Sequence, residues 1–340
     1  MTAEALATDD PRWDELVDVS PTPDVYYRPG YCRAYEAAGY GRVVAVVTDG
    51  ALFPLLLRPL PFEEDGFDAV TPYGYGGVLF TEPRSVKRTP LHQLRDWCVA
   101  NGVVSCLLRL HPLLGGSEQL SEIDGGAVEI HEHGPTTAVD PRQIDPGTRR
   151  LAGISKGRKA DLTIARRELE LAWGSDDDAL EAFRRVYNGT MERLGAGAFY
   201  LFPPEYYAAL VAGLGDRFAV ALARRRDDVV GGALFLADRR FAHYHLSGTT
   251  DAGREVKAGT LLVHAGAEWA ASRGSELLHL GGGTSGADSL FAFKKSFGGD
   301  TYTYSFASLV AEPERYEELV ARRSREPESP RSGFFPAYRA

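Results

Sequence analysis

The sequence predicts a mixed α/β protein in which one order of elements occurs twice: helix, three strands, helix, strand. Two hairpin signals support this prediction. Asp49-Gly50 separates two apolar runs in the first half, and residues 224–228 separate two more in the second half. In each half, a helical apolar stripe then leads to a further buried strand. Hairpin strands followed by a crossover helix give a mixed, twisted sheet that is flanked by helices.

The first half begins with a helical segment at about residues 24–38. The apolar runs on either side of Asp49-Gly50 are expected to be strands, and a third extended segment is expected at 73–80. Apolar positions at helical spacing then indicate a helix that precedes a last strand. The expected ranges are 43–47, 52–57, 91–98 and 103–110.

The second half begins its helix at Ser175-Asp176, where acidic side chains favour the positive end of a helix. The helix has apolar side chains three and four residues apart, which form one stripe. They are Leu180, Phe183, Tyr187, Met191 and Leu194. The elements expected after it are a short helix from Pro203, strands at 218–223, 229–236 and 241–247, a helix at 260–273 and a strand at 277–280.

Composition indicates an ordinary globular protein. The 340 residues are 44% hydrophobic and 25% charged, which favours two domains. We expect domains at 1–148 and 149–323 and a tail at 324–340. No run approaches the roughly 18 apolar residues of a membrane span, and the N-terminus lacks the basic-then-apolar order of a signal peptide, so a cytoplasmic location is expected. Three cysteines in apolar contexts are expected to be buried thiols: Cys32, Cys98 and Cys106.

The charge is unevenly distributed. A net charge of -9 argues against broad nucleic-acid binding. Between residues 149 and 167, however, seven basic side chains stand against Asp161 alone. They are Arg149, Arg150, Lys156, Arg158, Lys159, Arg166 and Arg167. Such a cluster suits a phosphate-bearing partner, and the alternative is a solvated helix face.

A glycine run marks a candidate ligand site. The strand at 277–280 ends on Gly281-Gly282-Gly283, and Asp288 and then Phe293-Lys294 follow. Strand ends with glycine-rich exits bring backbone close to ligands in α/β proteins, and a lysine shielded by phenylalanines acts more strongly on a nearby anion. The alternative is a turn followed by a solvated pair, Lys294 and Lys295.

Absent motifs narrow the chemistry. The glycines are not followed by a P-loop lysine, and neither a Gly-x-Ser-x-Gly elbow nor a dinucleotide fingerprint occurs. His131 and His133 share a strand face but have no third ligand at readable spacing, so no metal is expected. The class of chemistry that remains is group transfer, in which the protein binds and positions two substrates.

Several segments together resemble the FemABX-like branch of the GNAT superfamily, over roughly residues 20–320. They are Pro72-Tyr73-Gly74-Tyr75-Gly76-Gly77, Tyr187-Asn188-Gly189-Thr190-Met191-Glu192-Arg193, Tyr244-His245-Leu246-Ser247-Gly248-Thr249, Gly259-Thr260-Leu261-Leu262, and His279-Leu280-Gly281-Gly282-Gly283 with Phe293-Lys294. The resemblance implies two tandem GNAT-like domains. It also implies transfer of an amino acid from aminoacyl-tRNA to an amine, with no other cofactor.

The resemblance places Phe293 and Lys294 at the active site. Transfer from an ester to an amine needs alignment of the amine and stabilisation of the oxyanion and leaving oxygen, and we assign the charge stabilisation to Lys294. Tyr244 is expected to orient the substrate or relay a proton; the alternative role is that of a tyrosine that only packs in the core. His245 or His243 is a candidate base, and its alternative is a structural histidine.

Further residues are expected to contact the substrates. Arg193 clamps a phosphate or carboxylate, and Tyr207 with Tyr206 lines the acceptor pocket unless it only packs on the preceding helix. The remaining substrate candidates are Tyr73, Tyr75 and Gly282. The tRNA candidates are Lys156, Arg158 and Lys159.

Three functions follow from these expectations. The first is an aminoacyl-tRNA-dependent aminoacyltransferase acting on a cell-wall precursor or a small biosynthetic amine. The second is an acyl-CoA-dependent N-acyltransferase, which is disfavoured because residues 254–259 depart from the pyrophosphate loop of ordinary acetyltransferases. The third is a non-catalytic binding module that keeps the fold.

Overall fold

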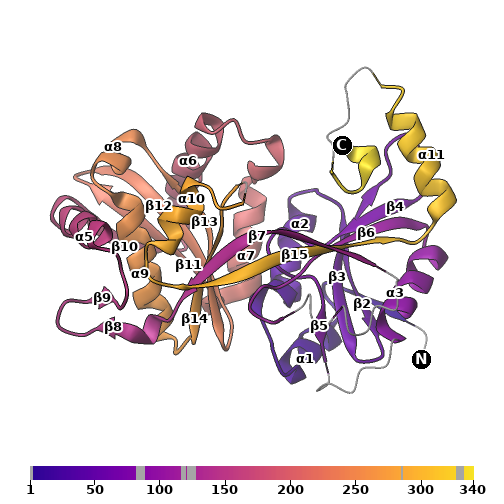
Figure 1. The fold of residues 1–340 in the computed structure, drawn as a ribbon, viewed down its shortest axis with the longest axis horizontal. Helices are drawn as coiled ribbons and strands as arrows, with labels where there is room; N and C mark the ends of the chain where they lie inside the picture. Colours follow the sequence, from indigo (N-terminus) through magenta and orange to yellow (C-terminus); the bar gives the residue numbers. More distant parts are fainter. Residues whose placement is uncertain (1–2, 82–88, 116–119, 121–127, 285, 327–332) are drawn as a thin grey trace. The chain divides into compact units, whose positions relative to one another are not determined.

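The computed structural model describes residues 3–81, 89–115, 120, 128–284, 286–326 and 333–340 (Figure 1). The chain forms two compact units: a first unit of Met1–His133 with Tyr304–Ala340, and a second unit of Gly134–Thr303. This division differs from the expected boundaries at 148 and 323. Two strands, β7 (Glu129–Val139) and β15 (Asp300–Val310), each begin in one unit and end in the other, so residues 304–340 belong with the N-terminal part.

The first unit has a sheet in the order β1-β2-β3-β4-β6-β15, and β5 also pairs with β3. Its strands are β1 (Glu4–Ala7), β2 (Arg42–Thr48), β3 (Ala51–Pro59), β4 (Phe67–Val70), β5 (Leu79–Phe80), β6 (Val103–Arg109) and part of β15. Its helices are α1 (Pro11–Val19), α2 (Pro29–Ala37), α3 (Thr89–Ala100) and α11 (Pro313–Arg323), with short 3-10 turns at Val25–Tyr27 and Ala337–Arg339.

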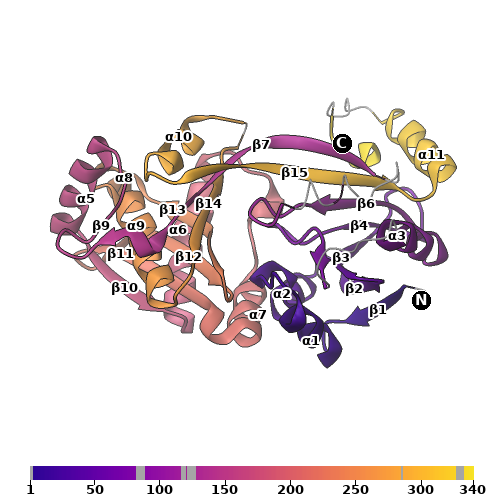
Figure 2. The ribbon, with the colours of Figure 1, turned by 60° about the horizontal axis from the view of Figure 1, so that its bottom comes forward.

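The second unit has a sheet in the order β7-β14-β13-β12-β11-β10 (Figure 2). Its strands are part of β7, β10 (Glu170–Gly174), β11 (Phe218–Arg225), β12 (Asp228–Ala237), β13 (Phe241–Thr249) and β14 (Leu277–Gly282), beside a small ribbon of β8 (Ile144–Asp145) and β9 (Arg150–Leu151). Its helices are α5 (Lys156–Glu168), α6 (Asp177–Arg193), α7 (Pro204–Leu214), α8 (Asp251–Glu255), α9 (Ala258–Ser272) and α10 (Ser289–Lys295).

The expected order of elements occurs in both units. In the first unit, β2, β3 and β4 are antiparallel, and α3 then leads to β6, which is parallel to β4. In the second unit, β11, β12 and β13 are antiparallel, and α9 leads to β14, which is parallel to β13. In each unit, an antiparallel strand lies next to this last one: β15 beside β6, and β7 beside β14.

Two expected elements lie elsewhere in the chain. The third strand of the first half is β4 (Phe67–Val70) rather than 73–80, of which only Leu79–Phe80 is extended. Gly74 has a φ of 109°, so the backbone turns there instead of continuing a strand. The helix expected at 24–38 is divided, because Pro29 starts α2 afresh after a 3-10 turn.

Helices cover both faces of the second unit's sheet. On one face, α9 packs against β12 and β13 and α5 packs against α9; α6 packs against the same two strands from the other face. Asp176 caps α6 by accepting a hydrogen bond from the Ala179 amide, as its acidic start predicts. The core beneath α9 includes Phe235, Leu262 and Leu278.

The tail of the first unit is docked. The Tyr338 ring is buried against Tyr316 of α11, and its hydroxyl lies 2.7 Å from Ser105 Oγ on β6. The three cysteines are buried thiols, as expected. In the described ranges, no helix combines the length and apolar character that crossing a bilayer requires.

Candidate functional site

The candidate site is built where two parallel strands of the second unit separate. β13 and β14 are paired from Phe241↔Leu277 to His243↔His279 and no further. Beyond that point β13 continues along β12, while β14 continues along β7 with Gly282 opposite Thr136. The backbone of β14 is thereby released from β13 just before the glycine run.

The glycine run bends the chain toward α10. Gly281 follows a bulge in β14 and has a φ of 77°, a conformation that favours glycine. At Gly283 a Cβ atom would lie only 2.2 Å from the Asp288 carboxylate, so a larger residue does not fit without movement. The backbone then turns within a few residues and starts α10 beside β14 (Figure 2).

Asp288 holds this turn in place. One carboxylate oxygen accepts a hydrogen bond from the Phe291 amide (2.9 Å) and thereby caps α10. The other accepts hydrogen bonds from both the amide and the hydroxyl of Thr284, each 2.7 Å long. From the sequence, Asp288 was expected only to lie between the glycine run and Phe293-Lys294. Its capping role could have been inferred only from an Asp that precedes Ser289-Leu290-Phe291, and this pattern also occurs in many loops that start no helix.

Lys294 lies near the end of α10 and turns back to the strand. Its Nζ donates a hydrogen bond of 2.7 Å to the carbonyl oxygen of Gly282. Burial lowers the pKa of Lys294 to about 8, and the nearby Asp288 carboxylate opposes that shift. A lysine with this pKa is mainly charged at neutral pH and still gives up its proton more easily than a surface lysine.

Phe293 and Arg158 lie together at the N-terminus of α9. The Arg158 guanidinium lies 5.0 Å from the centroid of the Phe293 ring, and it donates a hydrogen bond of 3.1 Å to the Thr260 hydroxyl. A Cβ atom at Gly259 would lie 3.6 Å from the Phe293 ring. The amide of Ser155, which caps α5, donates to the Ser296 carbonyl, so α5 and α10 are joined at this point.

The other two tRNA candidates differ from Arg158. Lys156 and Lys159 are exposed on the first turn of α5, whereas Arg158 is partly buried and also pairs with Asp161 at 2.8 Å. Only the two lysines are therefore fully open to a phosphate of a partner.

Tyr244 and His245 lie on opposite faces of the sheet. Tyr244 packs against Phe235 on the α9 side, whereas His245 lies 3.3 Å from the Tyr206 hydroxyl of α7. Burial raises the pKa of Tyr244 to about 12. Burial, and to a lesser extent the electrostatic effect of the neighbouring His243, lowers the pKa of His245 to about 3. Near neutral pH the phenol therefore keeps its proton, and the imidazole is neutral and a weak base.

Arg193 and Tyr207 make contacts within the protein. Arg193 donates a hydrogen bond of 3.1 Å to the Thr249 carbonyl and lies 3.8 Å from Asp251, so it connects α6 to the end of β13. The Tyr207 ring is buried against Phe183 and Tyr206. These contacts join neither residue to the group around Lys294.

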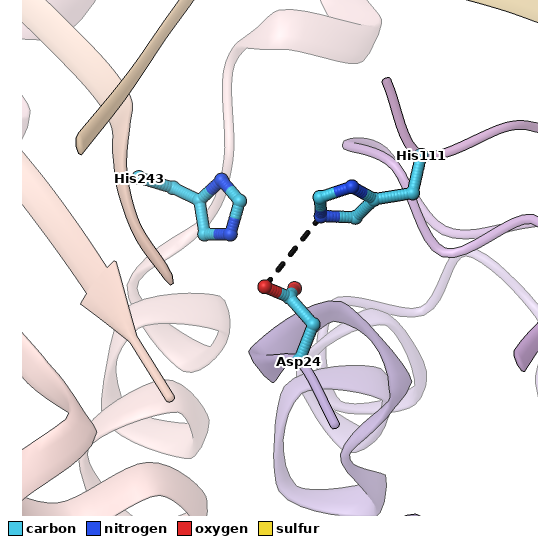
Figure 3. A group of neighbouring side chains, drawn as sticks. All are labelled: Asp24, His111 and His243. Carbon is cyan, nitrogen blue, oxygen red and sulfur yellow. Dashed lines mark ion pairs between the residues drawn. The ribbon is translucent and has the colours of Figure 1, made fainter. Parts of the chain in front are cut away.

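Tyr73 and Tyr75 belong to the first unit. The hydroxyls of Tyr31 and Tyr35 both donate to the Tyr73 carbonyl. The partly buried Tyr75 ring packs edge-on against the His111 ring. In the same unit, His111 Nε2 lies 3.5 Å from the buried Asp24 carboxylate (Figure 3). The two tyrosines thus form part of a polar aromatic cluster of the first unit.

His131 and His133 pack on aromatic rings of β15. His131 stacks on Phe306 and lies 3.0 Å from Ser308 Oγ, and His133 packs edge-on against Tyr304. Both side chains therefore have partners within the first unit.

Comparisons with known proteins agree with this architecture. Residues 149–295 match the family model described as an acetyltransferase (GNAT) domain. The solved structure of FemX is similar over 94% of this chain and 99% of its own, with a TM-score of 0.70 and 14% identity. The C-terminal domain of a putative lysylphosphatidylglycerol synthetase from Agrobacterium fabrum is similar over 87% of this chain and 92% of its own (TM-score 0.55, 15% identity).

A tandem GNAT protein from the clavulanic acid biosynthesis pathway is similar over 91% of this chain and 98% of its own, with a TM-score of 0.54 and 11% identity. No curated protein sequence is significantly similar to the chain. The resemblance to the FemABX-like branch is thus confirmed at the level of the fold. The chain has the fold of FemX, and its residues 149–295 match an acetyltransferase (GNAT) domain.

Proposed function

We propose that the protein is an aminoacyltransferase that takes the amino acid from aminoacyl-tRNA and forms an amide on an amine acceptor. The observation that carries this proposal is the position of Lys294, whose ammonium is held at the Gly282 carbonyl where β13 and β14 have separated. The similarity in fold to FemX and to the C-terminal domain of a putative lysylphosphatidylglycerol synthetase supports this chemical class.

The reaction needs few groups from the protein. The neutral amine attacks the ester carbonyl, a C–N bond forms, and the C–O bond to the ribose breaks. The proton lost by the amine ends on the leaving ribose oxygen. Lys294, charged but with a lowered pKa, is suited to stabilise the oxyanion and to neutralise that leaving oxygen. Tyr244, protonated at neutral pH, is suited to donate a hydrogen bond to substrate.

The alternative donor is an acyl-coenzyme A. Ordinary acetyltransferases wrap its pyrophosphate with a loop at the position that residues 253–260 occupy here. In this chain Asp251–Glu255 forms the helix α8, and the Phe293 ring and Arg158 pack at the start of α9. This arrangement favours the ester donor, because the pyrophosphate position already has protein groups against it.

The test is a transfer assay with both donors. Total tRNA charged with radiolabelled amino acids is incubated with the protein and with either a peptidoglycan precursor pentapeptide or a set of small diamines. In the parallel arm, radiolabelled acetyl-coenzyme A replaces the tRNA. Transfer that ribonuclease abolishes supports the proposal. Transfer that survives ribonuclease and requires the thioester overturns it.

The acceptor is an amine of either a cell-wall precursor or a small biosynthetic molecule, and the two acceptor arms separate these classes. Charged tRNA is available in the cytoplasm, which agrees with the expected location. The exposed Lys156 and Lys159 are the proposed phosphate contacts of the tRNA, so their replacement by glutamine should weaken binding and reduce its salt dependence.

A further inference from the structure

A groove lies in the second unit, away from Lys294. It is an open groove of about 440 Å³ between β10, β11 and the C-terminal half of α9. Trp173, Trp269 and Phe218 give it apolar walls. Trp173 lies on β10, the last strand of this sheet, and 42% of its surface is exposed. Large exposed aromatic side chains in a groove are typical of binding sites.

The tryptophans present flat surfaces. The rings of Trp173 and Trp269 are nearly parallel, with 24° between their planes and 6.5 Å between their centroids. The Arg273 guanidinium lies over the Trp269 ring at 5.2 Å. Both indoles also pack on the buried Phe235 ring, which fixes them in place. Rigid indoles of this kind stack well on planar heterocycles.

Arginines contact a carboxylate at the edge of this groove. Glu268 lines it, and Arg149 donates two hydrogen bonds to this carboxylate, of 3.1 and 2.9 Å. Arg166 lies 3.7 Å from the same carboxylate, so two cations surround one anion. Arg150, which follows Arg149 in the chain, has a buried Nε with no hydrogen-bond partner among the described residues. The excess positive charge suits a ligand that carries phosphates.

The groove and the Lys294 site lie along one helix. Thr260, at the start of α9, binds Arg158 beside Phe293, and Phe293 precedes Lys294. Glu268 follows eight residues later, which is about 12 Å along the helix axis. The start of α9 therefore contacts Arg158 near Lys294, and Glu268, farther along the same helix, contacts Arg166 and Arg149 at the tryptophan groove.

We propose that this groove binds an unpaired base near the 3′ end of the RNA donor. The base stacks on Trp173, and the neighbouring phosphates lie against Arg149 and Arg166. This inference rests on the proposed function, because it assigns a subsite to the same tRNA. The combination of a stacking surface with arginines is the arrangement by which proteins hold single-stranded nucleic acid.

The test compares two short ligands. Fluorescence titration measures binding of the RNA tetranucleotide ACCA and of an abasic tetranucleotide with the same number of phosphates. Trp173→Ala should weaken ACCA binding by about 10-fold or more and leave the abasic ligand nearly unaffected. Trp173→Phe should restore most of the affinity. Arg149→Gln should weaken both ligands alike. The matched control is Phe199→Ala, which removes another exposed aromatic ring of the second unit.

The outcomes separate this inference from the proposed function. If Trp173→Ala binds ACCA like the wild type while ribonuclease-sensitive transfer persists, the groove proposal fails and the proposed function stands. If transfer proves to need acyl-coenzyme A and ACCA does not bind, both fail. Sedimentation of the wild type and of Trp173→Ala covers another occupant: a dimer that the substitution dissociates would make the groove an interface between copies and overturn the proposal.

Discussion

Asp288 and Lys294 lie at opposite ends of α10; the Asp288 side chain turns back to the preceding loop, and the Lys294 side chain turns back to the end of β14. Asp288 accepts hydrogen bonds from Thr284, and Lys294 donates to the Gly282 carbonyl. The helix and its loop therefore form one small rigid element, in which an acidic and a basic group fix the same backbone. This element positions Lys294, and its Asp288 carboxylate opposes the lowering of the Lys294 pKa by burial.

Replacement of Lys294 should abolish most transfer. Lys294→Ala removes the only ammonium bound to Gly282 in the described ranges, and we expect kcat to fall by about 10²–10³-fold, as for loss of one oxyanion donor. The matched control is Lys295→Ala, which removes the same charge one residue away, where Nζ binds the Gly299 carbonyl. Steady-state transfer kinetics measure both. Full activity of Lys294→Ala would instead favour a binding module.

The rate should depend on pH through Lys294. Its pKa of about 8 means that the charged form is present below that pH and is lost as the pH rises through it. Because the charged form stabilises the transition state, kcat should decline above about pH 8. Lys294→Arg keeps its charge at alkaline pH and should remove this decline, whatever its absolute rate. A decline that persists unchanged in Lys294→Arg would point to another group.

Asp288→Asn should move the alkaline limb without unfolding the protein. Asparagine can keep the cap on the Phe291 amide through its one oxygen, so α10 should be retained, although its NH2 group cannot accept the two hydrogen bonds from Thr284. The Asp288 charge opposes the lowering of the Lys294 pKa, so its removal should lower that pKa further and shift the decline in kcat to lower pH. The pH profile is the readout, with circular dichroism as a check of folding. An unshifted profile would show that Asp288 acts only through the backbone.

Two glycines in helix interiors should respond in opposite directions to alanine. A Cβ atom at Gly266 would lie 2.1 Å from the buried Phe235 ring, so Gly266→Ala should lower the free energy of unfolding by about 1–3 kcal/mol. Gly189 has open space at its Cβ position, so Gly189→Ala should raise it by about 0.5–1 kcal/mol. Urea unfolding measures both; equal signs would contradict the packing of α9 on β12.

Local patterns predicted the repeat, because hairpin turns and helical stripes are set by neighbouring residues. The Asp49-Gly50 turn appears in the structure. Of the predicted stripe, Leu180, Phe183 and Tyr187 are buried in α6, whereas Leu194 follows the helix and is 65% exposed. The pairing of β7 and β15 with distant strands was not predicted, since their partners are set by tertiary contacts.

At the candidate site, the glycine run and Lys294 were found from the order of residues. The contacts of Arg193 and the groove at Trp173 were not, because Thr249 and Trp269 are 56 and 96 residues away from them.

The division of the chain has a consequence for its synthesis. The second unit is one continuous segment, Gly134–Thr303, inserted into the first. On the ribosome it is complete while the first unit still lacks the partner of β6, since Phe306–Val310 is synthesised after it. The whole second unit, with Lys294, is therefore available before the sheet of the first unit is complete, and a translation stop near residue 303 would leave β6 with an uncovered edge.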